Sequence, residues 1–292
     1  MTSEPLVYID GKFYPKGDAK ISVFDHGLLY GDGVFEGIRC YNGVVFRLKQ
    51  HIDRLYSSAQ YINLRIPVSK EEMGKIVCDT IRKNGQKDAY VRLVVTRGFG
   101  DLGLDPRKCP KPTTICISQQ FDPLYGDMYD KGISIVSVGA RRIAPDSFDV
   151  KAKTLNYLNN ILAKIQANLA GCDEALMMNN LGYACEGTGD NFFIVKDGKI
   201  YTPPTEAGVL RGITRQVVFE IADKLRTRYT EKNLTLFDVY TADEAFMTGT
   251  AAEIIPIICV DDRTIGDGKP GAITKRLMAE FVKIREKDGT KV

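Results

Sequence analysis

The chain has 292 residues, of which 44% are hydrophobic and 26% are charged, and its formal net charge is +3. This is the composition of an ordinary globular protein, so disordered and fibrous classes are excluded. The small net charge does not favour a nucleic acid or an anionic membrane as a partner. A chain of this length can bury sizeable cores, and we expect two domains.

Cysteine usage and the first residues bear on the cellular compartment. Residues 1–5 contain no basic segment followed by an apolar run, so we expect no secretory signal. No apolar run approaches the roughly 18 residues that a membrane span needs. The seven cysteines are scattered without a C-x-x-C pair, which favours neither a zinc site nor a disulfide framework. We therefore expect a cytoplasmic protein without a bound metal.

The first third of the chain predicts two hairpins, two helices and two further strands. The dipeptides Asp-Gly at 10–11 and Asn-Gly at 42–43 separate short apolar segments, which is the pattern of tight hairpins. Apolar residues repeat at helical spacing in two later segments, the second of which ends at Asn-Gly. The expected elements are strands at 7–9, 12–14, 34–40 and 44–46, helices at 48–62 and 70–83, and strands at 90–96 and 113–119.

A polar stretch with glycine and proline follows, and it separates two expected domains. We expect a small N-terminal α/β domain over 1–121, a linker over 122–130, and a larger C-terminal domain over 131–292 with a β-rich core and flanking helices. The fold class is mixed α/β. The clearest elements after the linker are a strand at 133–138 and helices at 155–170, 214–226 and 272–287. In the first of these helices an apolar stripe runs along one face, formed by Leu155, Leu158, Leu162, Ile165 and Leu169.

Two segments carry the most informative chemistry. Lys153 lies near the start of an expected helix, and Glu186 lies at the end of an expected strand. An amine that forms a Schiff base and a carboxylate that keeps a pyridine nitrogen protonated are the two groups that pyridoxal 5'-phosphate (PLP) requires. The pair therefore suits an enzyme that holds this cofactor.

Other residues offer contacts for the phosphate of such a cofactor. Gly212 precedes an expected helix, whose first N–H groups and dipole attract anions. Hydroxyl and guanidinium groups add to this set. The residues expected to bind the phosphate are Arg54, Ile213, Thr214 and Thr250. Each signal alone is weak, because glycine precedes helices in many folds and Arg54 could be a surface partner on its own helix.

Together, the segments 152–158, 184–193, 210–215 and 246–253 resemble the class IV aminotransferases of PLP fold type IV, and within them the branched-chain amino acid aminotransferases. The resemblance extends over nearly the whole chain. It implies PLP as cofactor and a ping-pong transfer of the amino group between leucine, isoleucine or valine and 2-oxoglutarate, with glutamate as the other amino acid, as in branched-chain amino-acid biosynthesis. It also implies a homodimer with shared active sites, or a higher oligomer, and small-molecule amino acids and 2-oxo acids as partners.

The resemblance assigns roles around the cofactor. Lys153 is the Schiff-base and catalytic lysine, because it precedes Asn156 and Tyr157 as the family's lysine precedes its Asn and aromatic residue. Lys151 is the alternative candidate for the Schiff-base lysine. Some branched-chain members have an extra residue and two glycines between the lysine and the Asn-Tyr pair. Glu186 pairs with the pyridine nitrogen, and Tyr157 hydrogen-bonds the cofactor's 3′ oxygen. Cys185 stands where serine is usual, which should be tolerated because the two are nearly isosteric.

The segment 24–39, dense in glycine and aromatic residues, resembles the part of the family that contacts the substrate. Phe35 and Leu104 would form an apolar wall, with core packing as the alternative. Arg92 would bind the distal carboxylate of glutamate. Tyr30 would reach into the neighbouring subunit's pocket, and Tyr90 and the backbone of 250–251 would hold the α-carboxylate. The full set of substrate residues implied by the resemblance is Tyr30, Phe35, Tyr90, Arg92, Leu104, Thr250 and Ala251. Arg39 receives no firm role.

Three other functions share this cofactor site. A D-amino acid aminotransferase has an Arg-x-His arrangement in the loop after the 90–96 strand, but the only histidines here are His26 and His51. Aminodeoxychorismate lyase should need a pocket for a bulky dianion, which an apolar wall fits poorly. A non-catalytic PLP carrier needs neither an apolar wall nor a carboxylate clamp. The ranking among leucine, isoleucine, valine and aromatic substrates stays open.

Overall fold

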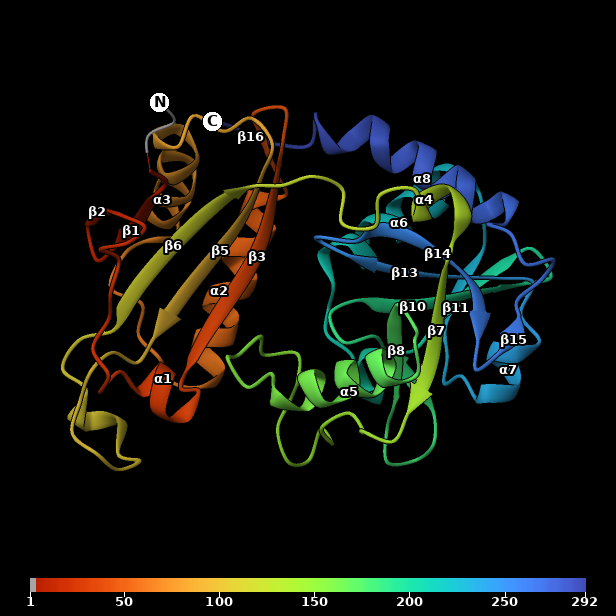
Figure 1. Cartoon of the computed structure of the whole chain (residues 1–292), viewed down its shortest axis with the longest axis horizontal. Helices are drawn as coiled ribbons and strands as arrows, with labels where there is room; N and C mark the ends of the chain where they lie inside the picture. Colours follow the sequence, from red (N-terminus) through yellow and green to blue (C-terminus); the bar gives the residue numbers. More distant parts are fainter. Residues whose placement is uncertain (1–3) are drawn as a thin grey trace. The chain divides into compact units, whose positions relative to one another are not determined.

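The structure is a computed structural model that describes residues 4–292. It divides into unit 1, made of Met1–Asp122, Ala152–Asn156 and Arg285–Val292, and unit 2, made of Pro123–Lys151 and Tyr157–Ile284 (Figure 1). The first change of unit falls in the expected linker. Two short segments of the expected C-terminal domain, 152–156 and 285–292, belong to unit 1 instead.

Unit 1 is built on a seven-stranded antiparallel sheet with the strand order β16-β4-β3-β5-β6-β1-β2 (Figure 1). Both expected hairpins are present, as β1 with β2 and β3 with β4. The strands are β1 (Leu6–Ile9), β2 (Lys12–Pro15), β3 (Gly33–Tyr41), β4 (Val44–Phe46), β5 (Ala89–Thr96), β6 (Thr113–Gln120) and β16 (Gly289–Lys291). The last of these was not expected from the sequence.

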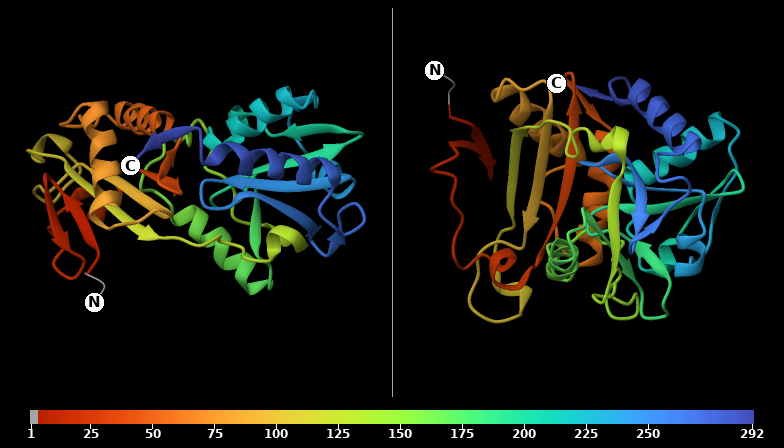
Figure 2. Two further views of the ribbon diagram at one scale, coloured as in Figure 1. Left: turned by 90° about the horizontal axis from the view of Figure 1, so that it is seen from above. Right: turned by 45° about the vertical axis from the view of Figure 1, so that its right-hand side comes forward.

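The helices α2 (Leu48–Tyr61) and α3 (Lys70–Lys83) cover one face of this sheet (Figure 2). The bounds of α3 are those expected, because a capping box between Ser69 and Glu72 starts the helix locally. Strand side chains alternate between faces, so Val34 and Ile38 of β3 pack on the helices while their neighbours face the other side. Unit 1 also contains the short helix α1 (His26–Tyr30) and the 3-10 turn η1 (Pro106–Lys108).

Unit 2 contains a nine-stranded mixed sheet with the order β12-β11-β10-β13-β14-β7-β8-β9, and β15 pairs with β14. Because β9 pairs with both β8 and β10, six of these strands close into a ring. The strands are β7 (Ile133–Val138), β8 (Glu174–Met178), β9 (Ala184–Glu186), β10 (Asn191–Lys196), β11 (Lys199–Thr202), β12 (Tyr229–Glu231), β13 (Glu244–Gly249), β14 (Glu253–Val260) and β15 (Arg263–Thr264). This closed sheet is the β-rich core of the unit.

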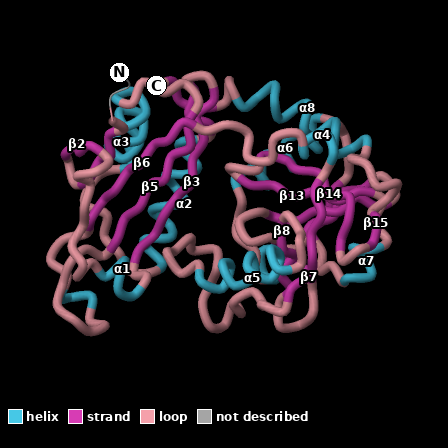
Figure 3. The backbone as a smooth tube through the Cα atoms, viewed as in Figure 1, coloured by secondary structure: helices cyan, strands magenta, loops and turns pink. Residues whose placement is uncertain are grey.

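Helices lie around the sheet of unit 2 (Figure 3). They are α4 (Met128–Lys131), α5 (Leu158–Leu169), α6 (Ile213–Lys224), α7 (Leu236–Tyr240), α8 (Ala272–Arg285), whose last residue belongs to unit 1, and the 3-10 turn η2 (Thr205–Ala207). Within residues 4–292, none of the helices combines the length and the apolar character that crossing a membrane would require.

Helix α5 differs from its expected form in two ways. It begins at Leu158 rather than 155, because Thr154 and Leu155 pair with the start of β3. Its small residues Ala163 and Ala167 are fully buried and pack with residues of β7 and β8. The apolar stripe from Leu158 to Leu169 faces outward, with Leu169 84% exposed. Small side chains let this helix approach the sheet closely, so the larger ones face away from it.

Candidate active site

Lys153 lies in unit 1 on a short extended segment beside the start of β3. Its carbonyl accepts the N–H of Phe35 at 3.0 Å, and its own N–H donates to Ser58 Oγ of α2 at 2.9 Å. The next residue, Thr154, pairs with Val34 in an antiparallel bridge. The backbone of Lys153 is thus held by both β3 and α2. Lys153 lies shortly before α5, near the start of that helix as expected, but the helix begins later than Leu155 because pairing with β3 keeps residues 153–155 extended.

The Lys153 side chain contacts an expected substrate residue. Its Nζ lies 4.7 Å from the centre of the Phe35 ring, and the guanidinium carbon of Arg92 lies 4.5 Å from the same centre. Arg92 is opposite Gly37 in the β3–β5 pair, so Phe35 and Arg92 share one face of the sheet. Arg92 Nη2 also donates to Tyr90 Oη at 3.2 Å. Unit 1 therefore brings the proposed lysine and three proposed substrate residues together.

A glycine in β3 makes room for Tyr90. A Cβ on Gly37 would lie 2.1 Å from Tyr90 Oη, so only glycine fits beneath this ring. The neighbouring Arg39 is buried, and its guanidinium lies over the rings of Tyr41 and Phe121 at 4.6 and 4.4 Å. Arg39 thus packs against aromatic side chains beside Tyr90.

On the opposite face of β3, Glu36 is fully buried and binds Arg54. Arg54 donates Nε to Glu36 Oε1 at 2.6 Å and Nη2 to Oε2 at 2.8 Å, and His51 Nδ1 lies 2.7 Å from Oε2. Burial raises the pKa of Glu36, but the charges and hydrogen bonds of Arg54 and His51 outweigh it and lower this pKa to about 2. Burial lowers the pKa of His51. Arg54 is therefore held bidentately and is not an ordinary surface residue.

The loop that carries Leu104 is attached to α1. The N–H of Gly103 donates to Tyr30 Oη at 2.9 Å, and His26 Nε2 lies 3.0 Å from the carbonyl oxygen of Asp101. Leu104 itself is 81% exposed, which rules out core packing for it. Phe35 is buried, but on the sheet face that carries Arg92 rather than on the face that packs on the helices.

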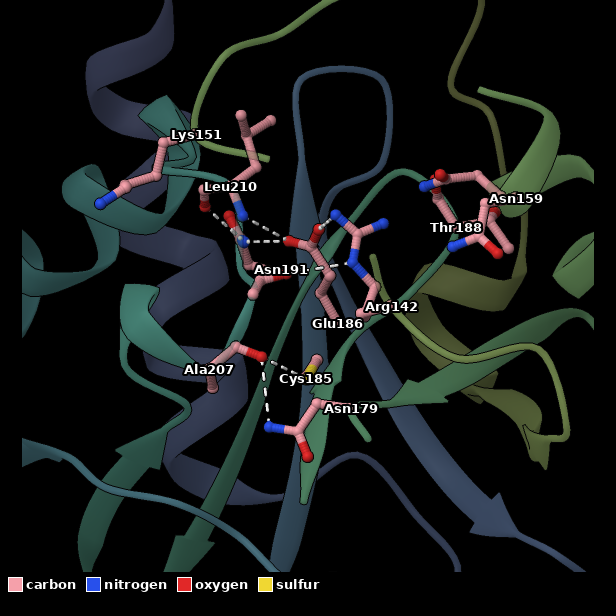
Figure 4. Close-up of polar contacts among 12 residues, drawn as sticks. Arg142, Lys151, Asn159, Asn179, Cys185, Glu186, Thr188, Asn191, Ala207 and Leu210 are labelled. Atoms are coloured by element: carbon pink, nitrogen blue, oxygen red, sulfur yellow. Dashed lines mark hydrogen bonds and ion pairs between the residues drawn. The ribbon is translucent and has the colours of Figure 1, made fainter. Parts of the chain in front are cut away.

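Glu186 ends β9 in unit 2, as expected, and its carboxylate has three partners (Figure 4). Arg142 Nη2 lies 2.7 Å from Oε1, and Oε2 accepts Asn191 Nδ2 at 2.9 Å and the N–H of Leu210 at 3.0 Å. The side chains of Arg142 and Glu186 are only 5% and 7% exposed. Arg142 is fixed in turn, because its Nε donates to the carbonyl of Gly208 at 3.0 Å. Glu186 is therefore far more constrained than a turn residue.

Residues 190 and 191 connect Glu186 with the expected phosphate contacts of unit 2. Asn191 Nδ2 also donates to the carbonyl of Leu210 at 2.9 Å, and a Cβ on Gly212 would lie 1.8 Å from Asn191 Oδ1. A Cβ on Gly249 would lie 1.8 Å from Asp190 Oδ1. Both glycines are therefore required for close approach. Glu186, the start of α6 and the turn 250–252 are grouped within one unit.

The start of α6 has the properties of an anion site. Gly212 occupies the N-cap position without a side-chain cap, and Ile213 and Thr214 follow as the first helical residues. Opposite Asn191 in the β10–β13 pair lies Thr248, whose buried hydroxyl has no hydrogen-bond partner in the described part of the chain. Free helical N–H groups and an unsatisfied hydroxyl suit a phosphate group.

Three further expectations concern residues near these groups. Lys151 pairs with Asp149 at 3.1 Å, its side chain is 40% exposed, and it points away from Glu186 (Figure 4). Tyr157 occupies the N-cap position of α5 and is partly buried. Cys185 is buried and donates to the carbonyl of Ala207 at 3.0 Å, and burial raises the pKa of its thiol to about 12. The Cys185 thiol therefore stays protonated and unreactive next to Glu186 in the chain, so serine could replace it.

Sequence reasoning did not assign roles to Arg142, Asn191, Glu36 or His51. Asn191 lies in the same segment as Glu186 and could have been found there. His51 and Arg54 have the i, i+3 spacing of one helix face, which could have suggested a shared acidic partner. Arg142 had no such signal, because it is distant in sequence from Glu186 and follows no motif.

Comparison with known proteins identifies the family. The family model described as Amino-transferase class IV matches residues 33–259. The chain is 56% identical over 286 residues to a putative branched-chain-amino-acid aminotransferase of Methanocaldococcus jannaschii, covering 98% of both chains. It matches the solved Escherichia coli branched-chain amino acid aminotransferase with a TM-score of 0.94 and 34% identity, over 98% of this chain and 96% of that one.

A further solved structure is that of the T.th. branched-chain amino acid aminotransferase complexed with N-(5'-phosphopyridoxyl)-L-glutamate, which matches with a TM-score of 0.92 and 35% identity over 99% of this chain and 96% of that one. The mixed α/β fold expected from the sequence is confirmed by these structures. The chain therefore belongs to the branched-chain amino acid aminotransferases of the class IV aminotransferase family.

Proposed function

We propose that the chain is a PLP-dependent transaminase that moves the amino group between leucine, isoleucine or valine and 2-oxoglutarate by a ping-pong mechanism. The observation that carries this proposal is the grouping of Lys153, Phe35, Tyr90 and Arg92 on one side of the sheet in unit 1. An amine, an apolar ring and a guanidinium together suit a substrate site that accepts either an apolar side chain or a second carboxylate.

Each unit by itself offers groups of the kinds that this cofactor requires, an amine and a held guanidinium in unit 1 and a buried carboxylate and a helix N-terminus in unit 2. Lys153 would hold it covalently, Glu186 would accept a hydrogen bond from its pyridine nitrogen, and Tyr157 would contact its 3′ oxygen. Its phosphate would be bound by Arg54, Ile213, Thr214 and Thr250. When bound, PLP supplies a positively charged ring that accepts electrons from the bonds of the substrate's Cα.

The chain's own groups would do the remaining work. The Lys153 amine, once displaced by the substrate, would remove the proton from the substrate's Cα. Phe35 and Leu104 would exclude water around an apolar side chain, while Tyr90 and the backbone of 250–251 would hold the α-carboxylate. Arg92 would bind the distal carboxylate of glutamate, which is costly to desolvate without a charged partner.

We also propose a homodimer, or a higher oligomer, in which Tyr30 reaches the neighbouring subunit's site. The outward stripe of α5 supports an interface, since Leu158 and Leu169 are 68% and 84% exposed and such patches mark interaction surfaces. Mixing inactive Lys153→Ala and Tyr30→Ala dimers should restore a fraction of the activity, because one hybrid site would contain both native residues. Proven subunit exchange without returning activity would contradict shared sites.

We also propose a cytoplasmic location. All seven cysteines are free thiols, which agrees with a reducing compartment.

Two experiments test the proposed function. In the first, single L- and D-amino acids are added to purified holoprotein, and L-leucine, L-isoleucine, L-valine and L-glutamate should bleach its visible absorbance while D-alanine should not. Bleaching by D-amino acids alone would contradict the proposal. In the second, borohydride reduction and peptide mapping should place the label on Lys153, and Lys153→Ala should abolish it. Labelling of Lys151 would overturn the lysine assignment.

A further inference from the structure

We propose that Arg142 is a positioning residue that, through its ion pair with Glu186, keeps the shared proton on the pyridine nitrogen of the bound cofactor. The inference rests on the proposed function, in which Glu186 faces that nitrogen. None of the sequence motifs pointed to Arg142, and only the ion pair within unit 2 brings it to the site.

The hydrogen bonds of Glu186 leave room for one more donor. An ionised carboxylate offers about four lone-pair directions, and three are used by Arg142, Asn191 and the N–H of Leu210. Asn191 and Leu210 bind Oε2, and Arg142 approaches Oε1 from the other side (Figure 4). The carboxylate is therefore fixed in one orientation, with acceptor capacity left for an N–H from a ligand.

The charge of Arg142 decides where a shared proton rests. An ion pair exists only while the carboxylate is ionised, so transfer of the ring proton to Glu186 would leave a buried guanidinium without its counter-charge. Such an uncompensated buried charge is costly, and the Arg142 side chain is only 5% exposed. The neutral donors Asn191 and Leu210 impose a much smaller penalty. The ring therefore keeps its proton and its capacity to accept electrons.

Arg142 is itself rigidly placed. Its backbone N–H donates to the carbonyl of Met178 at 2.8 Å, and its Nε donates to the carbonyl of Gly208 at 3.0 Å. The preceding residue, Arg141, is exposed. It provides a matched control, because it is the same residue type one position away without the contact to Glu186.

The test uses holoprotein loaded with PLP that carries ¹⁵N at the ring nitrogen. In the wild type the ¹⁵N resonance should be that of a protonated pyridine. In Arg142→Met and in Arg142→Gln, which keeps a hydrogen-bond donor without charge, the resonance should move toward the unprotonated position. We expect kcat for leucine to fall roughly 10- to 100-fold, the scale of one lost charge-assisted hydrogen bond, with KM changed less than about threefold. Arg142→Lys should restore most of both signals, and Arg141→Met should match the wild type.

The outcomes separate this inference from the proposed function. Wild-type protein that binds no PLP, or a Glu186→Gln variant whose ¹⁵N resonance does not move, would contradict the proposed cofactor site. A resonance that moves in Glu186→Gln but stays unchanged in a folded Arg142→Gln or Arg142→Met variant would overturn the role of Arg142. A kcat loss without a change of resonance would likewise assign Arg142 to structural support alone and overturn the inference.

Discussion

Two buried carboxylates, Glu36 in unit 1 and Glu186 in unit 2, are each bonded to an arginine, but in different ways. Both oxygens of Glu36 accept hydrogen bonds from Arg54, and His51 contacts Oε2 as well. Arg142 contacts only one oxygen of Glu186, and neutral donors bind the other. The two sites therefore differ in whether the arginine binds both carboxylate oxygens or only one.

This difference indicates which partner serves the ligand. In unit 1 both oxygens of the Glu36 carboxylate hold the Arg54 guanidinium in place, and the proposed function assigns this guanidinium to the phosphate. In unit 2 the guanidinium fixes the carboxylate, which the proposed function assigns to the ring nitrogen. An arginine–glutamate pair thus offers its cation to a ligand in unit 1 and its anion to a ligand in unit 2.

The largest effect is expected for Glu186→Gln. A neutral amide cannot stabilise a protonated pyridine, so transamination should slow by about a thousandfold or more while PLP binding is retained. Single-turnover kinetics with leucine and titration of the apoprotein with PLP measure the two quantities. A near-normal rate would mean that another acid faces the ring nitrogen, and the contrast with Glu36 would disappear.

Glu36→Gln should lower the stability of the protein. Without its counter-charge the mostly buried Arg54 guanidinium is uncompensated, and removing one partner of a buried pair costs roughly 3–5 kcal/mol. Urea denaturation should show this loss as a lower free energy of unfolding. The control Glu71→Gln, at an exposed position of α3, should change stability by less than about 0.5 kcal/mol. Equal effects of the two substitutions would refute the bidentate pair.

The same pair should impose a pH dependence. The pKa of Glu36 is lowered from 4.5 to about 2, so its stabilising contribution is fully present above pH 4.5 and is lost as the pH falls toward 2. The shift corresponds to about 3 kcal/mol. The difference in unfolding free energy between wild type and Glu36→Gln should therefore shrink by about this amount on acidification. A difference that is constant across that range would count against the ion pair.

Arg92 extends the comparison, because its hydrogen-bonded partner is the neutral Tyr90 hydroxyl rather than a carboxylate. Arg92→Leu should weaken the glutamate and 2-oxoglutarate half-reaction by roughly 2–3 kcal/mol, the scale of a lost charged hydrogen bond. The leucine half-reaction should change much less. Equal losses in both half-reactions would assign Arg92 to the α-carboxylate or to structural support.

The smallest effect is expected for Cys185→Ser, directly before Glu186. A serine hydroxyl can donate to the carbonyl of Ala207 as the thiol does, so kcat should stay within about twofold of the wild type. The ¹⁵N resonance of bound PLP should also be unchanged. A large loss of activity would show that the sulfur contributes to the orientation of Glu186.

The elements best predicted from the sequence are those with local signals. Helix α3 has the expected bounds because its capping box and apolar repeat lie within the helix itself. Helix α5 is only partly as expected, since Leu155 pairs with β3 instead of starting the helix and the apolar stripe lies outside the core. Helical spacing indicates that a stripe exists, but which face packs on the sheet depends on how closely the helix can approach it.

The sequence by itself determined the family, the mixed α/β class and the residue types suited to PLP. Motifs and the spacing of apolar residues in strands and helices can be recognised within short segments of the chain. Only the tertiary structure decided that the segment of Lys153 joins the sheet of unit 1, and that Arg142 rather than a nearer residue pairs with Glu186. Both depend on hydrogen bonds between segments far apart in the chain. No local spacing encodes such contacts, because they form only when the strands that carry them have folded together.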